Sequence, residues 1–145
     1  MYDASLTMET ADVHVTDDLI GGAVLALGDS AGIPVTDYAY MKNDGGNGII
    51  VLLEIGNDDV DGLDERVLSE RFETLLENAD GAYRDAVLHG TLSKAKIAFI
   101  EQETQLLYRD LTMNRIGRPT DPIRPVRYIN SPAKERFFRS RIIRK

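Results

Sequence analysis

Residues 33–55 read IPVTDYAYMKNDGGNGIIVLLEI, and this stretch decides the fold. Residues 33–41 and 48–55 are rich in β-branched, aromatic and other apolar residues, which favour strands. Between them, residues 42–47 (KNDGGN) contain the Asn and Gly that a tight turn between two strands requires. The stretch therefore predicts a β-hairpin. Its second strand is nearly all apolar, which indicates that both of its faces are buried.

The segments around the hairpin alternate between strands and helices. Before it, residues 11–15 alternate as a short strand does, and Thr16 is placed to cap a helix that ends near Gly28 or Gly32. After it, apolar residues at helical spacing predict a helix, a short helix follows, and residues 94–100 alternate as another strand. This order, β-α-β-β-α-β, predicts an α+β, ferredoxin-like core with an antiparallel sheet and both helices on one face.

The side chains expected to be buried together in this core come from the second strand of the hairpin and from the elements that follow it. They are Ile50, Leu52, Phe72, Leu75, Ile97 and Phe99. A third helix is predicted at about residues 103–115, and a proline-rich, basic extension, residues 118–145, follows it. The length suits a single domain spanning residues 1–145.

Charge is divided unevenly along the chain, although the net charge is only −7. Residues 1–90 carry 19 acidic and 4 basic side chains, whereas residues 91–145 carry 5 acidic and 13 basic ones. Attraction between the two halves within one fold is the simpler explanation, and a basic docking surface at the C-terminus is the alternative. The acidic majority of the chain disfavours nucleic acid as a partner.

Several classes of chemistry are excluded by residue type. The absence of cysteine excludes disulfides, thiolate nucleophiles and zinc–thiolate sites. His14 and His89 are the only histidines, and neither has the acid and nucleophile that a catalytic triad needs. No apolar run approaches the roughly 20 residues of a membrane-spanning helix, and no signal peptide opens the chain. We therefore expect a cytoplasmic protein without a membrane partner.

Two loops resemble ligand sites but have simpler explanations. Residues 43–48 (NDGGNG) could cradle a phosphate, yet they connect two strands, whereas phosphate loops connect a strand to a helix N-terminus. The acidic stretch with Asn57, Asp59 and Asp61 begins like a calcium loop, but Leu68 stands where the bidentate Glu is required. We expect a turn in the first case and no metal in the second.

Four short motifs resemble the C-terminal domain of the auxin-responsive (Gretchen Hagen) acyl-acid amido synthetases. Residues 16–18 (TDD) and 35–40 (VTDYAY) are similar to the family's capped helix and the strand after it. Residues 48–54 (GIIVLLE) are similar to a strand that ends in Glu, and residues 82–84 (AYR) to the end of a helix. The resemblance covers nearly the whole chain and implies the small, mobile domain of an adenylate-forming ligase.

The resemblance implies a division of labour between two domains. A large N-terminal domain would bind ATP and magnesium and form an acyl adenylate, and the small domain would then complete the site for amide transfer to an amino acid. The large domain, the acyl acid and the amino acid would thus be the partners. ATP and magnesium would reach this chain only through that missing domain, so the isolated chain is expected to be inactive and to bind no cofactor.

Candidate site residues follow from the same resemblance. A basic side chain is needed to neutralise charge on the transferred phosphate. The positions at which the family usually has lysine hold Val15 and Phe138 in this chain. The candidate catalytic residues are Arg139 and Lys134, and the candidate cofactor-binding residues are Arg136 and Arg141. The alternative function is a free-standing small-molecule-binding or regulatory module on the same fold.

Overall fold

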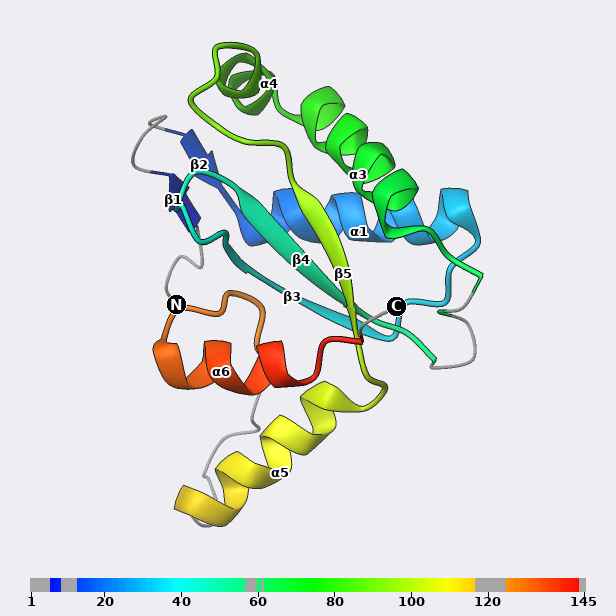
Figure 1. Ribbon diagram of the computed structural model, residues 1–145, viewed down its shortest axis with the longest axis vertical. Coiled ribbons are helices and arrows are strands. Elements are labelled where there is room, and N and C mark those ends of the chain that lie inside the picture. The colour runs from blue at the N-terminus through cyan, green and yellow to red at the C-terminus, as the bar shows by residue number, and fades with distance from the viewer. Residues whose placement is uncertain (1–5, 9–12, 57–59, 61, 117–124, 144–145) are drawn as a thin grey trace.

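The computed structural model describes residues 6–8, 13–56, 60, 62–116 and 125–143 (Figure 1). Its strands are β1 (Leu6–Met8), β2 (Val13–Val15), β3 (Asp37–Lys42), β4 (Ile49–Glu54) and β5 (Lys96–Ile100). Its helices are α1 (Asp17–Ala31), α3 (Glu65–Ala79), α4 (Gly81–Leu88), α5 (Thr104–Ile116) and α6 (Pro132–Ser140).

Helix α1 begins and ends where the sequence predicts. The backbone N–H of Leu19 donates to Thr16 Oγ1 at 3.1 Å, which satisfies one of the free donors of the first turn. Asp17 and Asp18 lie in that turn, where the helix dipole favours acids. The helix stops at Gly32, whose φ of 68° lies in the left-handed region that favours glycine.

The central sheet has the strand order β3-β4-β5 and is mixed. β3 and β4 form the predicted hairpin, with Lys42 opposite Ile49, and β5 runs parallel to β4, with Ile97 beside Val51. β1 and β2 pair with each other in a separate two-stranded sheet. The α+β class and the order of elements are confirmed, but the expected antiparallel sheet is wrong.

The difference in the sheet follows from the lengths of the connections. Two parallel strands can be neighbours only when a long crossover joins them, and α3 and α4 together supply that length between β4 and β5. In a ferredoxin-like sheet the first strand would lie beside β4. Here β2 has only three residues, is followed almost at once by α1, and pairs with β1 instead.

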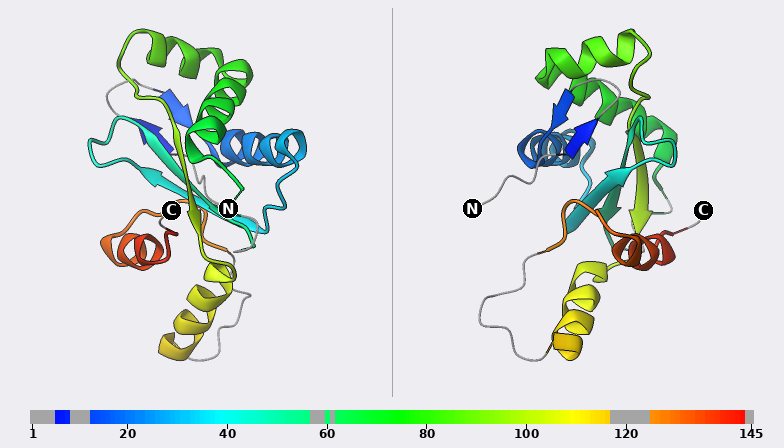
Figure 2. Two further views of the ribbon diagram at one scale, coloured as in Figure 1. Left: turned by 45° about the vertical axis from the view of Figure 1, so that its right-hand side comes forward. Right: turned by 90° about the vertical axis from the view of Figure 1, so that its left-hand side faces the viewer.

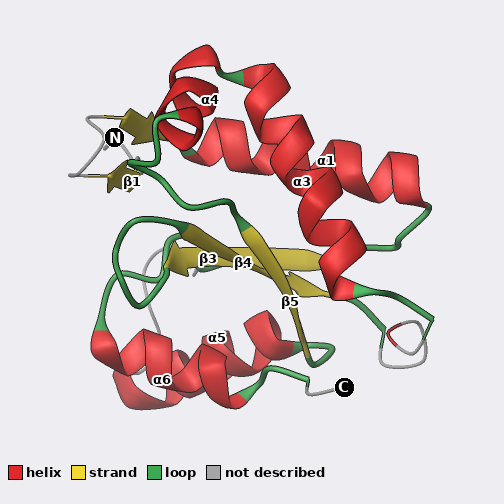
Figure 3. Cartoon of the chain, turned by 45° about the horizontal axis from the view of Figure 1, so that its top comes forward, coloured by secondary structure: helices red, strands yellow, loops and turns green. Residues whose placement is uncertain are grey.

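Helices cover both faces of the sheet, with α1, α3 and α4 on one face and α5 and α6 on the other (Figures 2 and 3). Because successive side chains of a strand point to opposite faces, β4 contributes to two cores. Val51 and Leu53 are buried with Phe72 in the first core, and Leu52 is buried with Phe138 in the second. The predicted burial of this strand on both faces is confirmed.

The six side chains predicted to share one core are divided between the two faces. Phe72, Ile97 and Phe99 are buried together in the first core. Leu52 belongs to the second core, and Ile50 is half-buried against it. The parallel register with β5 explains this correction, because it places Ile97 beside the odd-numbered side chains of β4.

Leu75 and Leu76 of α3 provide a matched test of the first core. Leu76 is completely buried (0% exposed), whereas Leu75 is half-buried at the margin of the same core. We expect Leu76→Ala to lower the free energy of unfolding by roughly 2–5 kcal/mol, and Leu75→Ala by clearly less, because fewer contacts are lost. Urea-induced unfolding of the two variants measures the difference. Equal losses would mean that α3 presents a different face to the sheet.

Candidate functional site

Helix α6, which carries most of the candidate residues, is fixed to the second face of the sheet by aromatic packing. Ser131 caps the helix by accepting from the backbone N–H of Lys134 at 3.3 Å. Phe138 is completely buried, and its ring lies 5.5 Å from that of Tyr108 and 5.3 Å from that of Phe137. The side chain at this position therefore anchors the helix, and a lysine in its place would be directed into an apolar core.

Arg139 lies between two carboxylates. Its Nε donates to Glu135 Oε2 at 2.6 Å, one turn earlier in α6, and its terminal NH2 group donates to Asp44 Oδ1 at 3.0 Å, in the hairpin turn. The Asp44 side chain is 92% exposed, so this second ion pair contributes little to stability and can open easily. Arg139 is thus held near the hairpin turn but can be released from it.

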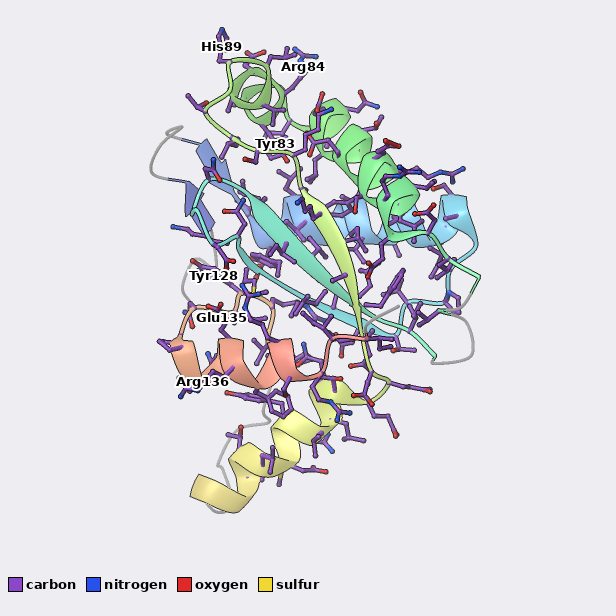
Figure 4. All side chains as sticks on the ribbon, in the orientation of Figure 1. Tyr83, Arg84, His89, Tyr128, Glu135 and Arg136 are labelled. Carbon is purple, nitrogen blue, oxygen red and sulfur yellow. The ribbon has the colours of Figure 1, made fainter. Side chains whose placement is uncertain are left out.

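The other candidate basic residues have separate surroundings. Lys134 Nζ donates to Asn130 Oδ1 at 3.4 Å. The side chain of Arg136 is exposed and makes no hydrogen bond or ion pair within the described part of the chain (Figure 4). Arg141 lies against the start of α5, where its Nε donates to Thr104 Oγ1 at 3.4 Å and its guanidinium lies 3.7 Å from Glu101. The four residues share one helical segment but do not converge on one point.

A groove of about 360 Å³ lies between the hairpin turn and the start of α6. Its lining includes the acids Asp44 and Glu135, the base Lys42 and the aromatic side chain of Tyr128. The acids outnumber the base among these side chains, and the first turn of α6, at Ser131 and Pro132, also borders the groove. This groove alone does not provide the cradle that a triphosphate needs.

A second polar cluster, which the sequence analysis did not identify as a site, is centred on Arg127. Its terminal NH1 group donates to Asp37 Oδ1 at 2.5 Å and to the carbonyl oxygen of Tyr38 at 2.8 Å. The guanidinium also lies over the Tyr38 ring, 4.2 Å from its centroid. Burial raises the pKa of the Tyr38 phenol. A groove of about 440 Å³ adjoins the cluster and has a mainly apolar lining from α1 and residues 33–35.

Glu54 and Gln105 connect the end of the sheet to α5. Glu54 is buried (5% exposed), its Oε1 accepts from the backbone N–H of Gln105 at 3.0 Å, and its Oε2 accepts from Thr36 Oγ1 at 3.1 Å. The Gln105 amide donates to the carbonyl oxygens of Tyr38 and Val126 and accepts from the backbone N–H of Val126. The Glu that ends the family's strand motif therefore has a structural role in this chain.

Tyr83 and Arg84 belong to the motif at residues 82–84 (AYR) and differ in their environment (Figure 4). Tyr83 is buried, and its hydroxyl donates to Glu73 Oε1 at 2.7 Å. The same oxygen accepts from the backbone N–H of Ala95 at 2.8 Å, so Glu73 joins α3, α4 and the entry to β5. Arg84 is exposed and pairs only weakly with Asp85 at 3.8 Å. The motif contributes packing rather than a catalytic group.

Glu73 carries the most perturbed carboxyl of the described residues. Its Oε2 has no hydrogen-bond donor among them. Burial, together with the neighbouring Glu77 carboxyl, raises the pKa of Glu73 to about 7. Because both effects penalise the charged form, the folded protein holds a proton on this side chain that the unfolded chain releases near its ordinary value of 4.5.

This raised pKa predicts a pH-dependent stability. Between about pH 4.5 and pH 7 the folded state binds more protons than the unfolded state, so stability is fully present at low pH and falls as pH rises. Glu73→Gln should flatten this fall, which we expect to be roughly 1–3 kcal/mol between pH 5 and pH 8. Urea unfolding at both pH values measures it, with Glu70→Gln, an exposed residue of α3, as the control. An unchanged slope in Glu73→Gln would contradict the assignment.

The described residues contain neither a candidate metal site nor a candidate membrane-spanning helix. Within them, no group of three or more His, Asp or Glu side chains could hold a metal ion, and no helix is long and apolar enough to cross a membrane. Asn57, Asp59 and Asp61 of the calcium-like loop, and the side chain of His14, lie outside the described residues. His89 is exposed at the end of α4, with Nδ1 2.7 Å from the carbonyl oxygen of Asp85.

Two solved structures that are similar in fold to this chain are acyl acid amido synthetases. The "GH3.15 acyl acid amido synthetase" matches with a TM-score of 0.77 and 13% identity, over 98% of this chain and 27% of that chain. The "AtGH3.15 acyl acid amido synthetase in complex with 2,4-DB" matches with a TM-score of 0.74 and 14% identity, over 99% of this chain and 26% of that chain. No family model matches the sequence, and no curated protein matches it significantly.

These comparisons establish likeness of fold. The chain spans about a quarter of the length of the synthetases that it matches, and the match leaves almost none of this chain uncovered. The resemblance inferred from the sequence motifs is therefore confirmed at the level of the fold: the chain is similar along its whole length to one part of an acyl acid amido synthetase, consistent with the C-terminal domain of that family.

Proposed function

We propose that this chain is the small, mobile domain of an ATP-dependent acyl acid amido synthetase. In this proposal a large domain binds ATP, magnesium and an acyl acid and forms the acyl adenylate, in the cytoplasm. The small domain then closes and completes the site for amide transfer to an amino acid. The observation that carries the proposal is the match of 98% of this chain to 27% of a synthetase chain.

Arg139 is the residue that we propose to act on the transferred phosphate. A guanidinium can stabilise charge that develops on a phosphate, provided it is not fully neutralised by the protein. The exposed Asp44 is a weak partner, so an incoming phosphate could replace it, while Glu135 would keep the side chain in position. Lys134 is the second candidate, and Arg136 and Arg141 are proposed to contact the nucleotide on closure.

Replacing Arg139 tests this role in the complete enzyme. We expect Arg139→Ala to lower kcat by roughly 10–100-fold with little change in ATP affinity, because the contact would form only after closure. Arg139→Lys should restore activity only in part, since an ammonium lacks the planar fork of a guanidinium. Steady-state kinetics with saturating and limiting ATP separate the two effects, with Arg84→Ala, an exposed arginine of α4, as the control. Wild-type kcat in Arg139→Ala would remove Arg139 from the mechanism.

The isolated chain should neither bind Mg-ATP tightly nor form an acyl adenylate. Both require a rigid cradle for three phosphates and their magnesium, and the glycine cluster of this chain forms a turn between β3 and β4 instead. Calorimetric titration with Mg-ATP and an assay of pyrophosphate release on the 145-residue chain measure this directly. Submillimolar binding together with acyl-dependent release would make the chain a complete enzyme and contradict the proposal.

The Arg127 groove favours a second candidate function, a free-standing small-molecule-binding or regulatory module. Its volume of about 440 Å³ is within the range of small-ligand sites, and Arg127 places a fixed guanidinium at one end. A panel of small amphipathic metabolites screened by thermal shift, with Arg127→Met as the control, would distinguish this function. Binding that disappears in the variant, in a chain with no large partner domain, would favour the module over the ligase domain.

A further inference from the structure

Helix α5 exposes more large apolar side chains than any other described element. Leu106, Leu107, Leu111 and Met113 are 41%, 38%, 45% and 38% exposed. The helix extends away from the rest of the molecule, beyond the edge of the sheet (Figures 1 and 2). Singly exposed leucines are ordinary on a protein surface, whereas neighbouring ones on one helix can mark a contact site.

The packing of α5 explains why these side chains have no cover. Its N-terminal turn is held by Thr104 and Gln105, which are buried, and Tyr108 lies against the aromatic rings of α6. Leu107 and Leu111 are one turn apart and form an apolar stripe beside this buried face, while Leu106 and Met113 lie on the opposite side of the helix. Beside Tyr108, which packs against the second core, Leu107 and Leu111 are therefore left about two fifths exposed.

The size of the surface favours one kind of occupant. Leu107 and Leu111, each with about two fifths of its area exposed, together offer on the order of 150 Å² of apolar surface. A stable homodimer buries roughly 600 Å² or more on each partner, so α5 alone is too small to hold two free copies together. Contacts between domains of one enzyme can be weaker, because a linker or a shared complex supplies a high effective concentration.

We propose that the Leu107 and Leu111 stripe of α5 docks on the large domain of the synthetase. The partner follows from the comparisons, because the matched synthetases contain about three quarters of their chain beyond the part that this fold covers. The identity of the partner thus rests on the proposed function. α5 is the anchor of the small domain, and α6, packed beside it through Tyr108, carries Arg139 toward the site.

Cysteine labelling of the complete enzyme tests the docking. The 145 residues contain no cysteine, so Leu107→Cys and Leu111→Cys each introduce one defined probe into this chain. Leu88→Cys is the matched control, because Leu88 is 73% exposed at the end of α4, on the other face of the sheet. Maleimide modification is followed by mass spectrometry of the peptides from this chain, and each rate is divided by the rate of the same variant in urea.

We expect the probes on α5 to react at least tenfold more slowly than the probe at position 88. Equal normalised rates would overturn the proposal. Protection that increases with protein concentration would also overturn it, in favour of a second copy of the chain. A purified native protein without any large domain would overturn it as well. Acyl-dependent pyrophosphate release, measured on the same samples, separates the two hypotheses. Release with unprotected α5 rejects only the docking, whereas protection without release rejects the proposed function and, with it, the partner named here.

Discussion

The burial of β4 on both faces is the constraint on which the rest of the structure depends. A strand with Val51 and Leu53 on one side and Leu52 on the other cannot be stable with either side in water, because each buried aliphatic side chain contributes roughly 1.5–3 kcal/mol. Helices must therefore cover both faces. The chain meets this requirement with α1, α3 and α4 from its first two thirds and with α5 and α6 from its last third. The two cores make the C-terminal extension part of the fold rather than an appendage.

The second layer is held by a few long-range contacts. Glu54 places a buried carboxylate at the N-terminus of α5, where the helix dipole and the backbone N–H of Gln105 stabilise its charge. The Gln105 side chain bonds to the backbone on both sides, at Tyr38 and at Val126, much as a neighbouring strand would. Arg127 adds an ion pair to Asp37. Together these contacts hold residues 125–129 beside β3 and bring α6 to the sheet.

The acidic and basic side chains are distributed so that the proposed catalytic face, on α6, is mainly basic. The acidic helices α1 and α3 lie on the face of the sheet opposite α6, so the basic residues of the C-terminal segment are separated from most of the acids. A few acidic side chains do lie near these basic residues. The most important are Asp44 and Glu135, which both pair with Arg139. Glu135 is 44% exposed and Asp44 is 92% exposed, so both ion pairs of Arg139 are weak enough to be exchanged for another anion. That arrangement suits a domain that meets its phosphate only when it closes.

The sequence by itself determined the local elements. The hairpin at residues 33–55, the Thr16 cap, a helix end near Gly28 or Gly32 and the two-sided burial of β4 depend on neighbouring residues, and the sequence shows those directly. The motif resemblance also identified the fold. Tertiary structure decided what depends on distant partners: β5 lies parallel to β4, Arg127 pairs with Asp37 across 90 positions, and the carboxyl of Glu73 faces Tyr83. The sequence suggests that four basic residues in one segment, Lys134, Arg136, Arg139 and Arg141, form a cluster. A helix, however, directs its side chains around its whole circumference. Only packing against the sheet determined which of them faces the core, which is paired and which is exposed.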